Sequence, residues 1–337
     1  MKKRLLNILQ YLLFLGFGVF LIWWSLRKLT NDDWNDIKLA FGNARYLIIL
    51  PVTLSLLASH WSRAARWNLL IEPLGYSPGI KNTYMAVLIG YLANLAIPRL
   101  GEVLKCTILS KYEKVPADKL LGTIVAERAF DAVCLVLVFV FTFLIQAKTI
   151  GNHLKVKLSE VNSHLSWNSL LFYLVAIVGM VLLLRFLLNK WTHVPVILKI
   201  KGLLTGILNG LTSIRYVKRK GLFIFHTVFI WAMYLLSVQL GLWALEETDH
   251  YGLNASLSIL STGSIAMIFT PSGLGAYPLF VQETMQLYGL RPSLGIAFGW
   301  LMWTVQFFII LFAGFVSLML LPQLNKKKHE KHTTHTT

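Results

Sequence analysis

The chain has 337 residues, of which 56% are hydrophobic and only 14% are charged. Soluble domains carry about 25% charged residues, so this composition excludes an ordinary soluble domain. The net charge of +17 does not indicate a nucleic acid partner, because the cytoplasmic loops of any membrane protein collect Lys and Arg.

Eight hydrophobic segments predict an all-α, polytopic membrane protein. Their apolar residues do not alternate with polar ones, and backbone groups in hydrocarbon must pair within helices. A spanning helix needs about 20 apolar residues. In chain order the segments cover residues 5–24, 47–61, 83–98, 120–145, 169–188, 222–245, 255–287 and 294–321.

The third and seventh segments are interrupted. Proline removes a helix donor and glycine relaxes the backbone, so neither segment should cross the membrane as one straight helix. We therefore predict six full spans and two broken, re-entrant segments; the alternative is that the breaks are plain turns between spans. The breaks contain Pro98, Gly101, Pro271, Ser272, Gly273 and Gly275.

Loop charge predicts the orientation. The stretch 185–221 holds eight basic residues and no acid, both ends of the chain are basic, and 246–249 is acidic. The positive-inside rule then places both termini in the cytoplasm. These placements require each broken segment to cross the membrane an even number of times. The membrane part then reads as an inverted-topology repeat of 1–150 and 151–325, with a polar tail at 326–337.

One cytoplasmic stretch, 194–217, has apolar residues at three- and four-residue steps with flanking lysines. This pattern is typical of an amphipathic helix lying on the membrane surface. The alternative is that its basic residues serve only as an orientation signal.

Charged residues at membrane depth mark a candidate site. Glu127, Arg128 and Asp131 lie in the fourth segment, and 14 residues follow before its outer end. That distance is roughly 21 Å, short of a core about 30 Å thick. Because each such charge costs at least about 2.5–3.5 kcal/mol, we expect the three to be paired and to face a cavity. The alternative is an ion-pair lock between helices.

A second cluster follows the first break. Arg99, Glu102 and Lys105 recur at three-residue steps after Asn94. On a helix they share one face, which predicts Arg99–Glu102 and Glu102–Lys105 pairs. Arginine is suited to gripping a phosphate with two hydrogen bonds. The alternative is a helix end with snorkelling charges at the interface.

Two further features are weaker. Arg63 and Arg66 stand between Trp61 and Trp67, which favours an aromatic and basic belt at the membrane interface. The glycine-rich second break can expose backbone amides to an anion. Glu283 follows this break and is a candidate partner for a buried arginine.

Together these motifs resemble the membrane domain of lysylphosphatidylglycerol synthases and the free-standing, flippase-like UPF0104-type proteins. The resemblance covers roughly 61–275. The second break departs from the family's usual Pro-Gly-Gly-x-Gly pattern, and Tyr277-Pro278 stands where an acid is expected. The matching residues are Arg63, Arg66, Trp67, Asn94, Pro98, Arg99, Gly101, Glu102, Lys105, Glu127, Arg128, Asp131, Pro271, Gly273 and Gly275.

The resemblance implies a lipid flippase of the bacterial inner membrane, not an enzyme, because a lysyl-transferase domain is not expected here. Its substrate would be an anionic phospholipid or a polyprenyl-linked lipid. Arg99, Arg128 and Lys105 would engage the headgroup, while Glu102, Glu127 and Asp131 hold them or exchange protons. Asn94, Arg63 and Arg66 are further candidate substrate-binding residues. The alternatives are an intramembrane enzyme that uses Glu127 or Asp131 as a base, and a non-transporting scaffold for envelope enzymes.

We expect no cofactor and no metal, because no zinc-binding, Walker or nucleophile-elbow motif occurs in the sequence. No nucleic acid partner is expected, and the sequence is compatible with an oligomer.

Overall fold

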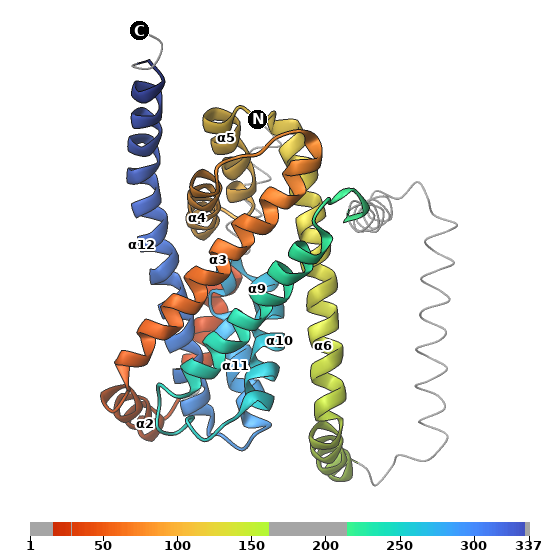
Figure 1. Cartoon of the computed structure of the whole chain (residues 1–337). Coiled ribbons are helices and arrows are strands. Elements are labelled where there is room, and N and C mark those ends of the chain that lie inside the picture. The colour runs from red at the N-terminus through yellow and green to blue at the C-terminus, as the bar shows by residue number, and fades with distance from the viewer. Residues whose placement is uncertain (1–15, 28, 162–213, 334–337) are drawn as a thin grey trace, which may run out of the picture.

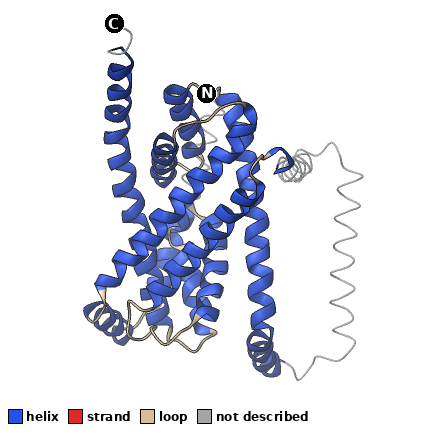
Figure 2. Ribbon diagram, viewed as in Figure 1, coloured by secondary structure: helices blue, strands red, loops and turns tan. Residues whose placement is uncertain are grey.

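A computed structural model describes residues 16–27, 29–161 and 214–333. Their regular elements are all helices, and none of these residues lies in a strand (Figure 2). This agrees with the predicted all-α membrane fold. The predicted segment 169–188, the first residues of segment 5–24 and most of the stretch 194–217 lie outside the described residues.

Four helical stretches are long and apolar enough to cross a membrane: Tyr46–Leu74, Ala117–Gln146, Lys220–Leu242 and Pro292–Lys326. They contain α3 and α9 and the greater part of α6 and α12 (Figure 1). In the described part of the chain the helices are Gly16–Leu26, α2 (Asn31–Gly42), α3 (Ile49–Ile71), α4 (Ile80–Ala96), α5 (Leu100–Glu113), α6 (Ala117–Val161), α9 (Lys220–Leu242), α10 (Leu253–Phe269), α11 (Ala276–Gln286) and α12 (Pro292–Thr333). Short 3₁₀ turns, η1 (Tyr46–Ile48), η2 (Glu72–Leu74), η3 (Ile214–Tyr216) and η4 (Pro271–Gly273), connect some of them.

The long helices run between the upper and lower ends of the molecule as drawn in Figure 1. α3 and α9 pack side by side, and α12 runs along both α4 and α11 (Figure 1). α6 and α9 begin, and α3 and α12 end, toward the top of that view. The described basic residues just before α9, at 215–219, therefore lie at the opposite end from the acidic loop that follows this helix.

Both broken segments form helical hairpins. The first consists of α4 and α5, and the second of α10, η4 and α11; each hairpin's helices pack against one another. The hairpins occupy different ends of the molecule (Figure 1). Their turns meet, because the Ser272 Oγ donates to the Asn94 carbonyl at 3.4 Å.

The two breaks have the same sequence of backbone conformations. Ile97 and Thr270 are extended, as expected for residues that precede proline. The residue after each proline has a positive φ, 69° at Arg99 and 52° at Ser272. L-residues seldom adopt this conformation, which costs about 1–2 kcal/mol. Each helix is thus stopped by proline and turned by a left-handed residue.

The first hairpin closes through two glycines. A Cβ on Gly101 would overlap the Gly90 carbonyl oxygen and lie 2.8 Å from the Asn94 side-chain oxygen. The Gly101 amide donates to that same oxygen at 2.8 Å. α4 and α5 therefore approach so closely that only glycine fits at the crossing.

We expect Gly101→Ala to lower the stability of the protein. The neighbouring backbone cannot move aside, and overpacking of this kind costs about 1–3 kcal/mol. Thermal unfolding in detergent measures the change. Gly122→Ala is the matched control, because nothing lies within 4 Å of a Cβ built at Gly122. Equal melting temperatures for the two variants would contradict the close crossing.

Candidate functional site

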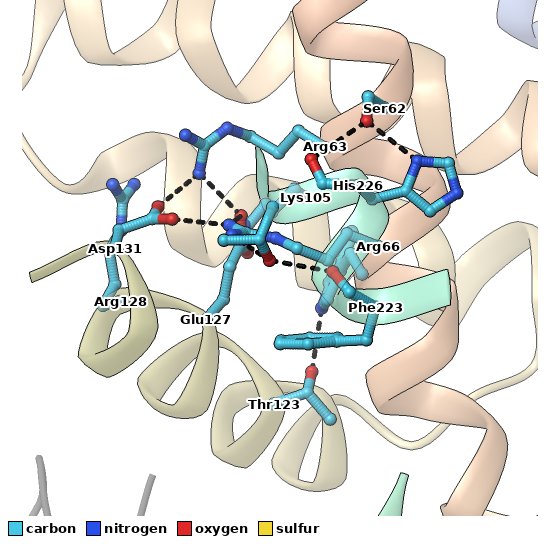
Figure 3. Close-up of polar contacts among 12 residues, drawn as sticks. Ser62, Arg63, Arg66, Lys105, Thr123, Glu127, Arg128, Asp131, Phe223 and His226 are labelled. Carbon is cyan, nitrogen blue, oxygen red and sulfur yellow. Dashed lines mark hydrogen bonds and ion pairs between the residues drawn. The ribbon is translucent and has the colours of Figure 1, made fainter. Parts of the chain in front are cut away.

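Three cations and two carboxylates meet where α3, α5 and α6 pack together (Figure 3). We call this set the buried lock. Arg63 lies 2.9 Å from Glu127 and 2.5 Å from Asp131. Arg66 lies 2.6 Å from Asp131, and Lys105 lies 2.8 Å from Glu127. One carboxylate of α6 thus joins α3 to α5.

The buried lock lies in the protein interior. The side chains of Arg66 and Glu127 are 0% and 1% exposed, and those of Arg63 and Lys105 are nearly as buried. Removing one member of such a pair typically costs about 3–5 kcal/mol, because its partner stays buried without a counter-charge. The set carries one surplus positive charge.

Helix periodicity explains the arrangement. Arg63 and Arg66 are three residues apart on α3, and Glu127 and Asp131 are four apart on α6, so each pair lies on one helix face. The predicted interface belt is therefore wrong for both arginines. They are buried because two carboxylates of α6 face them.

Trp67 reinforces this contact. Its side chain is fully buried, its indole donates to the Thr123 hydroxyl at 2.8 Å, and the Lys105 ammonium lies 4.5 Å from its ring centre. Trp61 alone keeps the exposure expected of a belt residue, at 43%.

The pairing predicted after the first break is also wrong. Glu102 pairs with Arg128 at 3.0 Å, and Lys105 turns instead to Glu127. The reason is that α5 begins only at Leu100, so Arg99 precedes the helix and does not share its face.

Glu283 does not pair with a buried arginine. It is exposed on α11 and makes no ion pair within the described residues. The carboxylates that the arginines need come from α6 instead.

A cavity of about 880 Å³ lies between the two hairpin turns and α12. Its polar lining comes mainly from α4, the two breaks, α6 and α12. It includes Asn94, Arg99, Arg128, Thr270, Ser272 and Trp303. The remaining wall is largely apolar and includes Ile97, Phe269, Phe307 and Ile310.

Two polar groups in this cavity lack partners. Arg99 is exposed and makes no ion pair within the described part of the chain. The Thr270 hydroxyl belongs to a residue only 4% exposed, and no hydrogen bond satisfies it among the described residues. The cavity thus offers the Arg99 cation to a ligand, whereas the Thr270 hydroxyl beside it is itself buried.

A second, much smaller cavity of about 10 Å³ has lining residues from both the large cavity and the buried lock. It shares Tyr91, Asn94 and Arg128 with the large cavity. Its other lining residues include Glu127 and Lys105 of the buried lock. Arg128 therefore stands between the large cavity and the buried lock.

The structure divides the residues singled out from the sequence into separate groups. Asn94, Pro98, Arg99, Arg128, Pro271 and Ser272 line the large cavity. Arg63, Arg66, Lys105, Glu127 and Asp131 form the buried lock. Gly101, Gly273 and Gly275 belong to the hairpin turns.

Sequence reasoning did not select Thr270 or Trp303. Thr270 had a usable signal, since it directly precedes the proline of the second break. Trp303 had none, because an aromatic residue in an apolar helix suits lipid and protein contacts equally. Its indole donates to the Ser272 carbonyl at 2.9 Å and so holds the second break against α12.

A family model described as the lysylphosphatidylglycerol synthase TM region matches residues 7–314. The chain belongs to this family. The UPF0104 membrane protein MJ1595 of Methanocaldococcus jannaschii is 24% identical over 351 aligned residues, which cover 97% of each protein. No solved structure matches the chain. The lysylphosphatidylglycerol synthase TM region thus spans both hairpins and the cavity between them.

We expect Glu127→Gln to destabilise the protein by about 3–5 kcal/mol, because three buried cations would then share one carboxylate. Thermal unfolding in detergent gives the measurement. Glu72→Gln serves as the control, since Glu72 pairs with Arg219 at 2.9 Å on an exposed surface and such pairs contribute at most about 1 kcal/mol. A Glu127→Gln melting temperature as high as that of the control would refute the lock.

Proposed function

We propose that this protein moves lipids with an anionic, phosphate-bearing headgroup across the membrane. The observation that carries the proposal is the cavity of about 880 Å³ between two helix breaks, lined by Arg99 and Arg128. Irregular backbone at membrane depth is tolerated where it is buried in protein or lines a cavity. Paired breaks of this kind are typical of transporter substrate sites.

The proposal includes an inverted-topology repeat with six spans and two re-entrant hairpins. The matching backbone of the two breaks supports it, as do the positions of the hairpins at different ends of the molecule (Figure 1). In this arrangement the cavity lies where the hairpin turns meet. Movement of one hairpin or the other would open it to opposite leaflets.

The charge balance supports an anionic headgroup. Five cations face three carboxylates around the first hairpin, an excess of two positive charges. An unpaired cation at membrane depth is costly, so the cavity favours a ligand that brings negative charge. The residues are Arg63, Arg66, Arg99, Lys105 and Arg128 on one side, and Glu102, Glu127 and Asp131 on the other.

The apolar wall supports a lipid over a free anion. Phe269, Phe307 and Ile310 line the same cavity as the arginines. A lipid tail can stay against such a surface while its headgroup reaches the polar groups. Phospholipids and polyprenyl phosphates share this chemistry, and both are candidates.

The geometry favours transport over intramembrane catalysis. Of the two candidate bases, Glu127 is held by three cations and Asp131 by two, and neither lines the large cavity. A general base must lie within hydrogen-bond reach of its substrate. We place the protein in the cytoplasmic membrane with its basic end inside, following the positive-inside rule.

Proteoliposomes containing phosphatidylglycerol with a fluorescent headgroup test the proposal. We expect the purified protein to move this lipid between leaflets faster than empty vesicles do. Arg99→Gln should slow the movement at least about tenfold, the factor that corresponds to one lost charge-assisted hydrogen bond. Arg219→Gln is the control, because Arg219 is exposed and pairs with Glu72 away from the cavity.

Two results would contradict the proposal. Rates equal to those of empty vesicles, for both phosphatidylglycerol and a polyprenyl phosphate, would favour the scaffold. A chemically altered lipid found by mass spectrometry would favour an enzyme.

A further inference from the structure

The arginines near the first hairpin are held in two different ways. Arg63 and Arg66 each contact both carboxylates of α6 and are buried. Arg128 has a single carboxylate partner, Glu102, and the two side chains are 45% and 30% exposed. Exposed ion pairs contribute little to stability. Among the ion-paired arginines that the structure describes near this hairpin, only Arg128 is therefore available for exchange.

The exchangeable pair lies beside the candidate site. Arg128 lines both cavities, while Glu102 lines only the smaller one. Arg128 can thus be approached from the large cavity, which Glu102 does not line. A phosphate there has Arg99 within the same cavity.

We propose that Glu102 is a competing carboxylate, which occupies the Arg128 guanidinium until an anionic headgroup displaces it. This inference rests on the proposed function. The phosphate binds more strongly here than the Glu102 carboxylate does, because it can contact Arg99 as well as Arg128. Arginine also binds phosphate through two parallel hydrogen bonds, which strengthens the contact.

The displaced carboxylate stays next to cations. Glu102 lines the small cavity together with Arg63, Lys105 and Glu127. The buried lock carries one surplus positive charge, so it attracts a carboxylate released from Arg128. The exchange therefore leaves both the headgroup and Glu102 next to positive charge.

The competition selects for ligand charge. An anionic headgroup supplies the negative charge that Arg128 loses when Glu102 leaves. A zwitterionic headgroup brings an ammonium with its phosphate, and among the residues that the structure describes no carboxylate lines the large cavity. Glu102 thus acts as a specificity-determining residue, although it does not line the large cavity.

Lipid titration of the purified protein, followed by native mass spectrometry, tests the inference. The probes are phosphatidylglycerol, phosphatidylcholine with the same chains, and a polyprenyl phosphate. Glu102→Gln should tighten phosphatidylglycerol binding by about threefold to fivefold, the gain expected when an exposed ion pair no longer competes. Phosphatidylcholine binding should not change.

The controls separate competition from general effects. Arg128→Gln should weaken phosphatidylglycerol binding, and Glu102→Gln should bring no gain in that background. Glu72→Gln removes a remote acid of equal charge and should leave binding unchanged. Inorganic phosphate is a further probe: failure to displace phosphatidylglycerol shows that the lipid tail contributes, whereas full displacement would reduce the site to a free-phosphate site and overturn the lipid proposal.

The outcomes distinguish the inference from the proposed function. If Arg99→Gln and Arg128→Gln weaken binding but Glu102→Gln does not tighten it, competition is refuted and the proposed function stands. An equal gain for phosphatidylcholine would also refute competition. If wild-type protein binds neither phosphatidylglycerol nor the polyprenyl phosphate more tightly than phosphatidylcholine, the proposed function fails.

Discussion

The ion pairs between α3 and α6 determine where the first hairpin can lie. Glu127 contacts Arg63 of α3 and Lys105 of α5 at the same time. At membrane depth none of these charges tolerates the loss of its partner. α5 must therefore stay docked against α6, and this fixes the first break and one wall of the cavity.

α12 completes the cavity by contacting both hairpins. Trp303 holds the carbonyl of Ser272 at the second break. Toward its other end, Asn325 exchanges two 3.0 Å hydrogen bonds with Asn82 of the first hairpin. One continuous helix thus contacts two hairpins that occupy different ends of the molecule. A movement that opens either side of the cavity must change a contact with α12.

Local features of the fold were predictable from the sequence, and pairings were not. Pro98 and Pro271 predict the two breaks, because proline restricts the backbone of the residues beside it. Glu127 and Asp131 are found by counting apolar residues to the end of a segment. Their partners lie more than 60 residues away on α3, and only the packing of the two helices brings them together. The same limit explains the wrong pairing of Glu102. The pairing predicted from residue spacing assumed a helix that included Arg99, whereas the backbone turns at this residue.

Arg99 and Ser272 show that the breaks do more than turn the chain. Both are left-handed residues in which glycine would carry no steric penalty. Strain of this kind persists where the surroundings require it, commonly at functional sites. Arg99 brings a cation to the cavity. The Ser272 hydroxyl reaches the Asn94 carbonyl across the meeting point of the hairpins, a contact that glycine cannot make. The side chains kept at these two strained positions therefore line the cavity itself, where one supplies charge and the other joins the two hairpins.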